Sequence, residues 1–222
     1  MCGRFTLAVD REQLEERFSF QATALAVTPH YNIAPSQPVL AVIGAEERRG
    51  GFLRWGLIPS WAKDPSIGDR MINARAETAA EKPSFRRALQ KRRCLVLADG
   101  FYEWKKEGKS KTPMYIRLQS HQPFGFAGLW ETWQSPDGAK IHSCTILTTE
   151  PNALMAPIHN RMPVILSRAG EAVWLDSSIE APAQLLPLLV PYPPEAMEAY
   201  AVSTTVNSPR NDTPGCIEPL PQ

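Results

Sequence analysis

The sequence predicts an α+β fold: a single domain, residues 1–222, with a curved, barrel-like, mainly antiparallel sheet and peripheral helices. Apolar runs with strand character outnumber helical patterns, and short turns separate them, which is typical of antiparallel sheets. The 21 prolines are spread along the chain and exceed the usual share of ~5%, which favours loops and sheet edges. No stretch has the composition of an interdomain linker, and no sequence period repeats.

One helix is expected at residues 10–18. Asp10 can cap its first turn, and Gln13 occupies the position of the answering residue in a capping box. Leu14 and Phe18 form an apolar pair one helical turn apart, which gives the helix a face for the core. Shorter helices are expected over 83–89, 169–175 and 183–189.

Strands are expected where β-branched and aromatic residues cluster between turn-forming residues. Turns at 107–110 and 135–138 contain glycine and join neighbouring strands into hairpins, and Asp99-Gly100 separates two further strands. The expected strands are 39–43, 52–58, 94–98, 101–105, 114–118, 124–133, 141–148, 164–166 and 199–206.

The composition excludes several classes of protein. No apolar run approaches the ~20 residues of a membrane helix, and no apolar stretch follows the first charged residue as in a signal peptide. We therefore expect a cytoplasmic protein that has no membrane partner. Cys2, Cys94, Cys144 and Cys216 show no metal-ligand spacing with one another or with the histidines, so no metal, cofactor or disulfide is expected.

Charge is distributed unevenly, although the net charge is only +1. Residues 48–117 hold 17 of the 24 basic residues and 7 of the 23 acidic ones. A basic segment of this kind suits a nucleic-acid groove, and a solvated basic face is the alternative. Arg86 lies in its densest part, beside Arg87 and shortly before Lys91-Arg92-Arg93.

Two tryptophans are interleaved with basic residues in segment 54–63. Trp55 belongs to an expected strand, and we assign it to the core. Trp61 follows Pro59-Ser60 in an expected loop. An exposed indole there suits stacking on the bases of single-stranded nucleic acid, which is worth ~1–3 kcal/mol per base.

Asn73, Arg75 and Glu77 stand at alternate positions and would share one face of an extended segment. An ordinary surface strand shows the same pattern. His159 and Arg161 lie two residues apart in an expected loop. Together they combine a proton shuttle with an anion-binding guanidinium, although a lone histidine is usually structural.

Glu103 stands between Tyr102 and Trp104 in the sequence. A carboxylate that is desolvated by such neighbours has a raised pKa, as a general acid or base requires. The alternative is an exposed strand residue without a chemical role.

The N-terminal sequence Met1-Cys2-Gly3-Arg4 carries the most distinctive chemistry. Removal of Met1 would leave Cys2 with an α-amine and a thiol on adjacent carbons. The α-amine has a pKa of ~7.7–8.0 against ~10.4 for lysine, so much more of it is neutral at pH 7. A neutral amine adds to an aldehyde to give an imine, on which the thiol can close as a five-membered thiazolidine. An idle near-terminal cysteine is the alternative.

Six motifs occur in one order along the chain. They are Met-Cys-Gly-Arg-Phe at 1–5, Tyr-Asn-Ile-Ala-Pro at 31–35, Trp-Gly-Leu-Ile-Pro-Ser-Trp at 55–61, Asn-Ala-Arg-Ala-Glu-Thr at 73–78, Ala-Asp-Gly-Phe-Tyr-Glu-Trp at 98–104 and His-Asn-Arg-Met-Pro at 159–163. Together they resemble the SRAP family of SOS-response-associated peptidases or abasic-site-processing proteins. The resemblance extends from Cys2 to the region of Asn207.

The resemblance implies binding to abasic sites in single-stranded DNA, or in single strand next to duplex, and a covalent thiazolidine crosslink that shields the lesion during the DNA damage response. Abasic-site lyase and autopeptidase activities are implied as well. Cys2 would be the nucleophile, and Asn73 would hold the sugar or the thiol. Glu103 would orient or deprotonate the α-amine, and His159 would shuttle protons.

The resemblance also implies a path for the DNA strand. Its phosphates would meet three arginines and its course would follow two tryptophans, to which the basic segment adds Arg86. These residues are Arg4, Arg75, Arg161, Trp61 and Trp104.

Two other functions are compatible with the sequence. Cys2, His159 and Glu103 could form a cysteine peptidase that cuts its own N-terminus or other proteins. The basic segment could instead serve a noncovalent single-strand-binding module. We expect a monomer in the cytoplasm that is associated with the nucleoid when bound to DNA.

Overall fold

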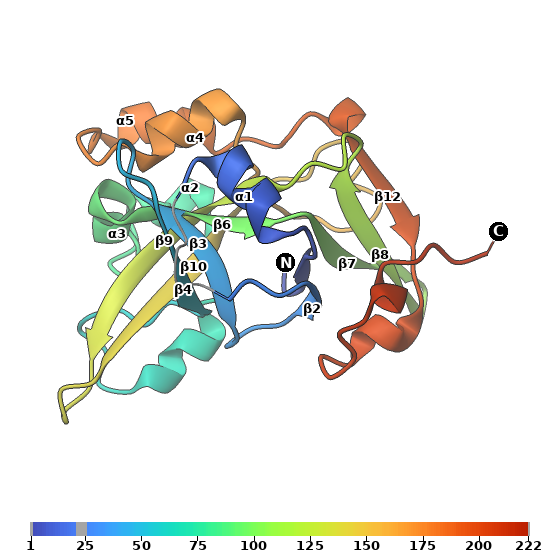
Figure 1. Cartoon of the computed structure of the whole chain (residues 1–222), viewed down its shortest axis with the longest axis horizontal. Coiled ribbons are helices and arrows are strands. Elements are labelled where there is room, and N and C mark those ends of the chain that lie inside the picture. Colours follow the sequence, from blue (N-terminus) through green and yellow to red (C-terminus); the bar gives the residue numbers. More distant parts are fainter. Residues whose placement is uncertain (1, 21–25, 222) are drawn as a thin grey trace.

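The computed structural model describes residues 2–20 and 26–221, and it contains two sheets with short helices around them (Figure 1). Buried residues from both sheets form one continuous hydrophobic core. A smaller buried cluster, which includes Tyr102 and Tyr115, lies under the C-terminal segment.

Five strands of the larger sheet close into a barrel. These strands are β3 (Pro38–Ile43), β4 (Arg49–Trp55), β6 (Arg93–Ala98), β9 (Phe124–Gln134) and β10 (Lys140–Thr149). Their order is β10-β4-β3-β6-β9, and the additional pairing of β9 with β10 completes the ring. Because β4 and β10 pair in parallel and the other neighbours are antiparallel, the barrel is mixed.

The smaller sheet is antiparallel throughout and has the order β12-β8-β7-β1-β2. Its strands are β1 (Phe5–Leu7), β2 (His30–Ile33), β7 (Gly100–Glu107), β8 (Ser110–Leu118) and β12 (Met197–Ala201). Two short strands join β10 outside the ring: β5 (Asn73–Arg75) in parallel and β11 (Met162–Pro163) antiparallel.

The helix expected near the N-terminus is confirmed as α1 (Arg11–Phe18). The Asp10 carboxylate accepts a hydrogen bond from the backbone of Gln13 at 2.8 Å, and Leu14 and Phe18 are buried. The other α-helices are α2 (Ala76–Ala79), α3 (Arg86–Lys91), α4 (Arg168–Leu175) and α5 (Pro182–Leu185). The 3₁₀ helices are η1 (Pro65–Arg70), η2 (Leu186–Leu188), η3 (Pro194–Ala196), η4 (Thr204–Asn207) and η5 (Pro214–Cys216).

An aromatic cluster joins β1 to the barrel. The ring of Phe5 lies 5.0 Å from that of Trp55 on β4 and 5.7 Å from that of Phe126 on β9, in edge-to-face geometry. Phe101 of β7 continues the cluster at 6.1 Å from Phe126. Such pairs contribute ~0.5–1.5 kcal/mol each beyond their buried area. The complete burial of Trp55 confirms its assignment to the core.

Polar contacts fix the same N-terminal strand to β7 and β8. The hydroxyl of Thr6 donates to the Asp99 carboxylate and lies 2.9 Å from the hydroxyl of Tyr115. The second carboxylate oxygen of Asp99 accepts from the backbone of Ala8 at 2.7 Å. Residues just ahead of β1 are therefore held at a defined place beside β7.

The predicted α+β class and barrel-like sheet are confirmed, but several expected boundaries are wrong. The strand expected at 52–58 ends at Trp55, because Gly56 turns the chain with a φ of 129°. Strand β5 gives way to α2 after Arg75, so Glu77 is helical rather than on an extended face with Asn73.

Proline and capping residues shift the remaining elements. The helix expected at 83–89 begins at Arg86, after a turn that contains Pro83. The helix expected at 183–189 is α-helical only as far as Leu185, where α5 ends. The chain continues as the 3₁₀ helix η2, because Pro187 lacks the N–H that an α-helical hydrogen bond needs. The last strand ends at Ala201, and Ser203 caps η4 in place of further strand. The strand expected at 164–166 is reduced to a single bridge at Ile165, next to β11.

In the described part of the chain, every helix is too short or too polar to cross a bilayer.

The small sheet leaves no space for a side chain at Gly100. A Cβ at this position would overlap the phenol of Tyr115, a side chain that is itself buried. We expect Gly100→Ala to lower the free energy of unfolding by about 1–3 kcal/mol in urea titrations. Gly51→Ala is the matched control, because a Cβ there meets open space, and its effect should stay within ~0.5 kcal/mol. Equal stability of the two variants would contradict this packing.

Candidate active site

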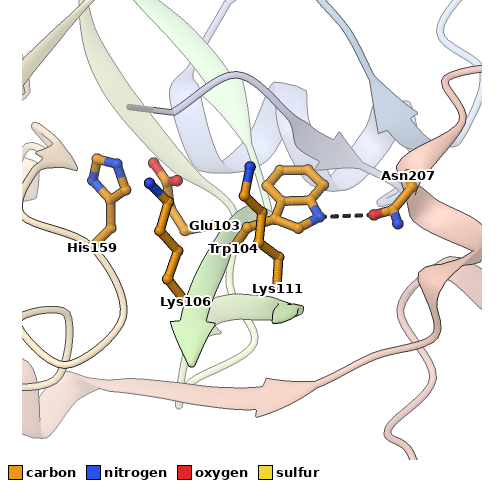
Figure 2. A pocket seen from close by; sticks show the side chains of 6 residues that line it. All are labelled: Glu103, Trp104, Lys106, Lys111, His159 and Asn207. Atoms are coloured by element: carbon orange, nitrogen blue, oxygen red, sulfur yellow. Dashed lines mark hydrogen bonds between the residues drawn. The ribbon is translucent and has the colours of Figure 1, made fainter. Parts of the chain in front are cut away.

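A pocket of about 450 Å³ opens beside the β7–β8 hairpin (Figure 2). Glu103, Trp104 and Lys106 contribute to it from β7, and Lys111 from β8. His159 lies on the opposite side, in the loop before β11, and Asn207 closes one end from η4. The pocket therefore combines a carboxylate, an imidazole, an indole and two ammonium groups.

Cys2 lies beside the part of β7 that lines the pocket. The pairing of Phe5 with Phe101 extends backwards, since the backbone N–H of Tyr102 donates to the Arg4 carbonyl at 2.9 Å. The same register brings residue 2 towards Trp104. The Cys2 side chain is fully buried, and its carbonyl accepts a hydrogen bond from the Asn73 amide at 2.7 Å.

Burial and the charge of Glu103 both act on the Cys2 thiol. Burial raises the thiol pKa, and the negative charge of Glu103 raises it further. At neutral pH the thiol is therefore protonated and uncharged. The thiol donates a weak hydrogen bond to the Arg4 carbonyl oxygen, which lies 4.0 Å from the sulfur.

Glu103 is buried rather than an exposed strand residue, since its exposed fraction is only 3%. Burial raises the pKa of its carboxyl group, and the charge of His159 partly lowers it. The imidazole of His159 is held in place because its Nδ1 lies 3.1 Å from the backbone nitrogen of Arg161. Of the two interpretations that the sequence left open for Glu103, the structure supports the desolvated carboxylate.

Arg161 lies beside this site but already has a partner. Its guanidinium donates two hydrogen bonds to the Glu77 carboxylate, at 2.6 and 2.9 Å, and a third to the Thr148 carbonyl at 2.5 Å. The hydrogen bond from Arg161 lowers the pKa of Glu77 below its usual range. The open anion-binding guanidinium expected from sequence is therefore an ion pair in this structure.

Arg4 holds the C-terminal segment instead of facing open solvent. It donates to the Asn32 side chain and to the Val206 carbonyl, both at 2.7 Å. Its guanidinium also lies 5.8 Å from the ring centre of Trp104, within range of a cation–π contact. The indole of Trp104 donates to the Asn207 side chain at 2.7 Å, so this segment fixes the orientation of the aromatic ring.

The other predicted DNA contacts lie outside the pocket lining. Trp61 is 59% exposed, which agrees with the expected loop position. Arg75 is exposed at the end of β5. Arg86 is exposed on α3, which packs against β6 and β9 rather than against the β7–β8 hairpin.

Sequence reasoning missed several residues of this region. Asn32 lies in the 31–35 motif without an assigned role, yet its amide donates to the carbonyls of Val206, Ser208 and Asn211. Lys106, Lys111 and Asn207 have no role assigned from the sequence either. The hairpin register gives a signal for the two lysines, because a turn at 107–110 sets Lys106 opposite Lys111.

In the described residues, no group of three or more His, Cys, Asp or Glu side chains is arranged to hold a metal ion.

The family model for SOS response associated peptidase (SRAP) matches residues 1–209. This chain belongs to the SRAP family. Curated relatives within the family include abasic site processing protein YoqW of Bacillus subtilis, which is 51% identical over 98% of this chain and 99% of its own length. Abasic site processing protein HMCES of Xenopus tropicalis is 35% identical over 85% of this chain and 65% of its own length.

Solved structures show the same SRAP architecture. A protein from Bacteroides thetaiotaomicron superposes with a TM-score of 0.91 at 29% identity, over 99% of this chain and 100% of that chain. A protein from Bordetella bronchiseptica superposes with a TM-score of 0.79 at 26% identity, over 91% of this chain and 100% of that chain. The barrel and the small sheet are thus shared features of these proteins.

The raised pKa of Glu103 predicts how stability depends on pH. A carboxyl group whose pKa is higher in the folded than in the unfolded state stabilises the fold at low pH and loses that contribution as the pH rises through the folded value. Glu103→Gln keeps the shape without the buried charge, so it should be more stable than the wild type at neutral pH. This advantage should shrink towards ~4.3, the unfolded-state pKa.

The measurement is urea unfolding of both proteins across this pH range. Glu107→Gln serves as the control, because Glu107 is exposed at the end of the same strand. A Glu103→Gln protein less stable than wild type at neutral pH would show that burial imposes no net electrostatic cost on the carboxylate.

Proposed function

We propose that this protein captures abasic sites in single-stranded DNA, or in single strand next to duplex, as a covalent thiazolidine with Cys2. Its relatives are named abasic site processing proteins. The position of Cys2 carries the proposal: it is buried, its thiol senses the charge of Glu103, which lines the pocket, and its backbone is held by Asn73. The chemistry requires that Met1 be removed, because only Cys2 as first residue has both an amine and a thiol.

The proposed reaction proceeds in two bond-forming steps. The neutral α-amine of Cys2 attacks the C1 aldehyde of the ring-opened deoxyribose, and loss of one water gives an imine. The thiol then adds across the carbon–nitrogen double bond, so that sulfur bonds to carbon and the proton moves to nitrogen. The product is a five-membered thiazolidine, and the only other product is the water released in the first step.

The side chains around the pocket suit the proton transfers of this reaction. Glu103, with its raised pKa, accepts a proton from the α-ammonium group and so generates the nucleophile. His159 faces the same pocket and transfers a proton while the sugar ring opens. Asn73 keeps residue 2 in place through its hydrogen bond to the Cys2 carbonyl.

The neutral thiol favours this reaction over peptide hydrolysis. A cysteine peptidase needs a thiolate, and burial together with Glu103 disfavours that form of Cys2. In the thiazolidine reaction the amine attacks first, so the thiol enters only after the aldehyde is already bound. Lyase activity would follow from the same imine if the thiol did not close the ring.

The DNA strand is proposed to reach Cys2 along Trp104, with contacts from Trp61, Arg75 and Arg86 on exposed surfaces. Arg4 is bonded to the Val206 carbonyl and Arg161 to the Glu77 carboxylate. Each can contribute to DNA binding only if its guanidinium contacts a phosphate in addition to this partner.

The first test uses an abasic single-stranded oligonucleotide and denaturing electrophoresis. Protein that begins at Cys2 should form an adduct that survives denaturation and high salt, and Cys2→Ala should form none. Cys2→Ser and Cys2→Ala both keep the α-amine once Met1 is removed, so each should retain only an imine, which does not survive denaturation and is visible after trapping with borohydride. Cys94→Ala, which removes a different buried thiol, should behave like the wild type. An undiminished adduct in Cys2→Ala would exclude Cys2 as the nucleophile.

A second test addresses the positioning role of Asn73. Asn73→Ala removes the 2.7 Å hydrogen bond to the Cys2 carbonyl, and we expect the single-turnover rate of adduct formation to fall about tenfold or more. Noncovalent affinity for lesion-free DNA should change much less, because the side chain is directed at the protein backbone. A rate equal to that of wild type would remove Asn73 from the mechanism.

A further inference from the structure

Two lysines line the pocket without a part in the chemistry proposed above. Lys106 and Lys111 lie directly opposite each other in the antiparallel pairing of β7 with β8. Both side chains are exposed, and both reach from the hairpin into the pocket (Figure 2).

This pair is electrostatically unfavourable unless an anion is bound. Like charges directly opposite on adjacent strands repel and destabilise the pairing. Lys105, the neighbour of Lys106, is neutralised by Glu107 at 2.6 Å. Within residues 2–20 and 26–221, by contrast, neither Lys106 nor Lys111 forms an ion pair with a carboxylate.

The surroundings define the kind of anion. The indole of Trp104 lies in the same pocket, with its orientation set by Asn207. An aromatic surface next to cationic side chains is the combination that binds single-stranded nucleic acid, where bases stack and phosphates meet positive charge. Glu103 occupies the same pocket and, when ionised, repels an anion, which would keep a phosphate at the lysines.

We propose that Lys106 and Lys111 form a phosphate-binding subsite for the DNA strand, which holds one phosphate adjacent to the lesion while Trp104 contacts the neighbouring base. This inference rests on the proposed function only in taking DNA as the ligand. The subsite would raise the local concentration of the lesion at Cys2 and is independent of the covalent step.

The decisive experiment measures noncovalent binding of a lesion-free single-stranded oligonucleotide by fluorescence anisotropy, in a Cys2→Ala background, at a series of salt concentrations. Lys106→Gln combined with Lys111→Gln should weaken binding and reduce the slope of log K against log [salt] by about 0.7, because the protein then neutralises one phosphate fewer. Lys109→Gln, on the turn of the same hairpin and outside the pocket lining, is the control and should leave the slope unchanged.

A second measurement identifies the phosphate. Oligonucleotides with a neutral methylphosphonate 5′ or 3′ of the abasic site, and oligonucleotides with or without a terminal phosphate next to it, are compared in rate of capture at low DNA concentration. One change in the DNA should slow capture by the wild type and leave capture by the double lysine variant unaffected. That change identifies the phosphate that the two lysines bind. If every substitution slows both proteins equally, the subsite is refuted.

The outcomes separate this inference from the proposed function. Equal salt slopes in the wild type and the double variant would overturn the subsite even if the adduct with Cys2 forms normally. A reduced slope without any adduct would support the subsite and contradict the covalent chemistry. The thermal unfolding midpoint should not fall in the double variant, because the substitutions remove a repulsion, so weaker binding cannot be attributed to unfolding.

Discussion

The antiparallel pairing of β1 with β7 fixes the start of the chain against Glu103, and the proposed chemistry depends on this pairing. An N-terminal segment is ordinarily poorly ordered unless the structure ties it down. In this protein the aromatic contacts of Phe5 hold it to the barrel, and the contacts of Thr6 with Asp99 and Tyr115 hold it to the small sheet. The Asn73 amide then fixes residue 2 itself.

The pocket contains two electrostatically unfavourable arrangements. The Glu103 carboxyl is buried, which raises its pKa, and two lysines face each other across a hairpin without a carboxylate partner among the described residues. Unfavourable arrangements of this kind cluster at functional sites, because a ligand can relieve them. In our account the carboxylate is neutralised when it accepts the proton of the Cys2 α-ammonium group, and a DNA phosphate compensates the lysines.

Local patterns in the sequence predict those features that depend on local contacts. Asp10 and Gln13 are three residues apart, and their capping contact is present as expected. The aromatic residues beside Glu103 suggest a desolvated carboxylate but leave an exposed strand residue as the alternative, and the structure shows that Glu103 is buried. The motif resemblance identifies the family, although no local pattern alone would join Cys2 to Asn73, 71 residues away.

Contacts between distant segments account for most of what the sequence does not predict. Arg161 and its partner Glu77 are separated by 84 residues, and Trp104 and Asn207 by 103. Such contacts decide whether an arginine faces solvent or a protein partner. Arg4 and Arg161, for which the resemblance implies phosphate contacts, are bonded within the protein in this structure. Element ends move for a similar reason, since Gly56 and Ser203 end or cap segments whose composition alone suggests strand.

Peptide mapping of the DNA adduct is the most direct test of the central claim. Protein that begins at Cys2 is incubated with an abasic oligonucleotide, digested with nuclease and protease, treated with an alkylating agent for free thiols, and analysed by mass spectrometry. The account predicts that the sugar remnant is found on the N-terminal peptide and that Cys2 in this peptide resists alkylation. A remnant attached to any other peptide, or an adduct in which the Cys2 thiol is still alkylated, would contradict it.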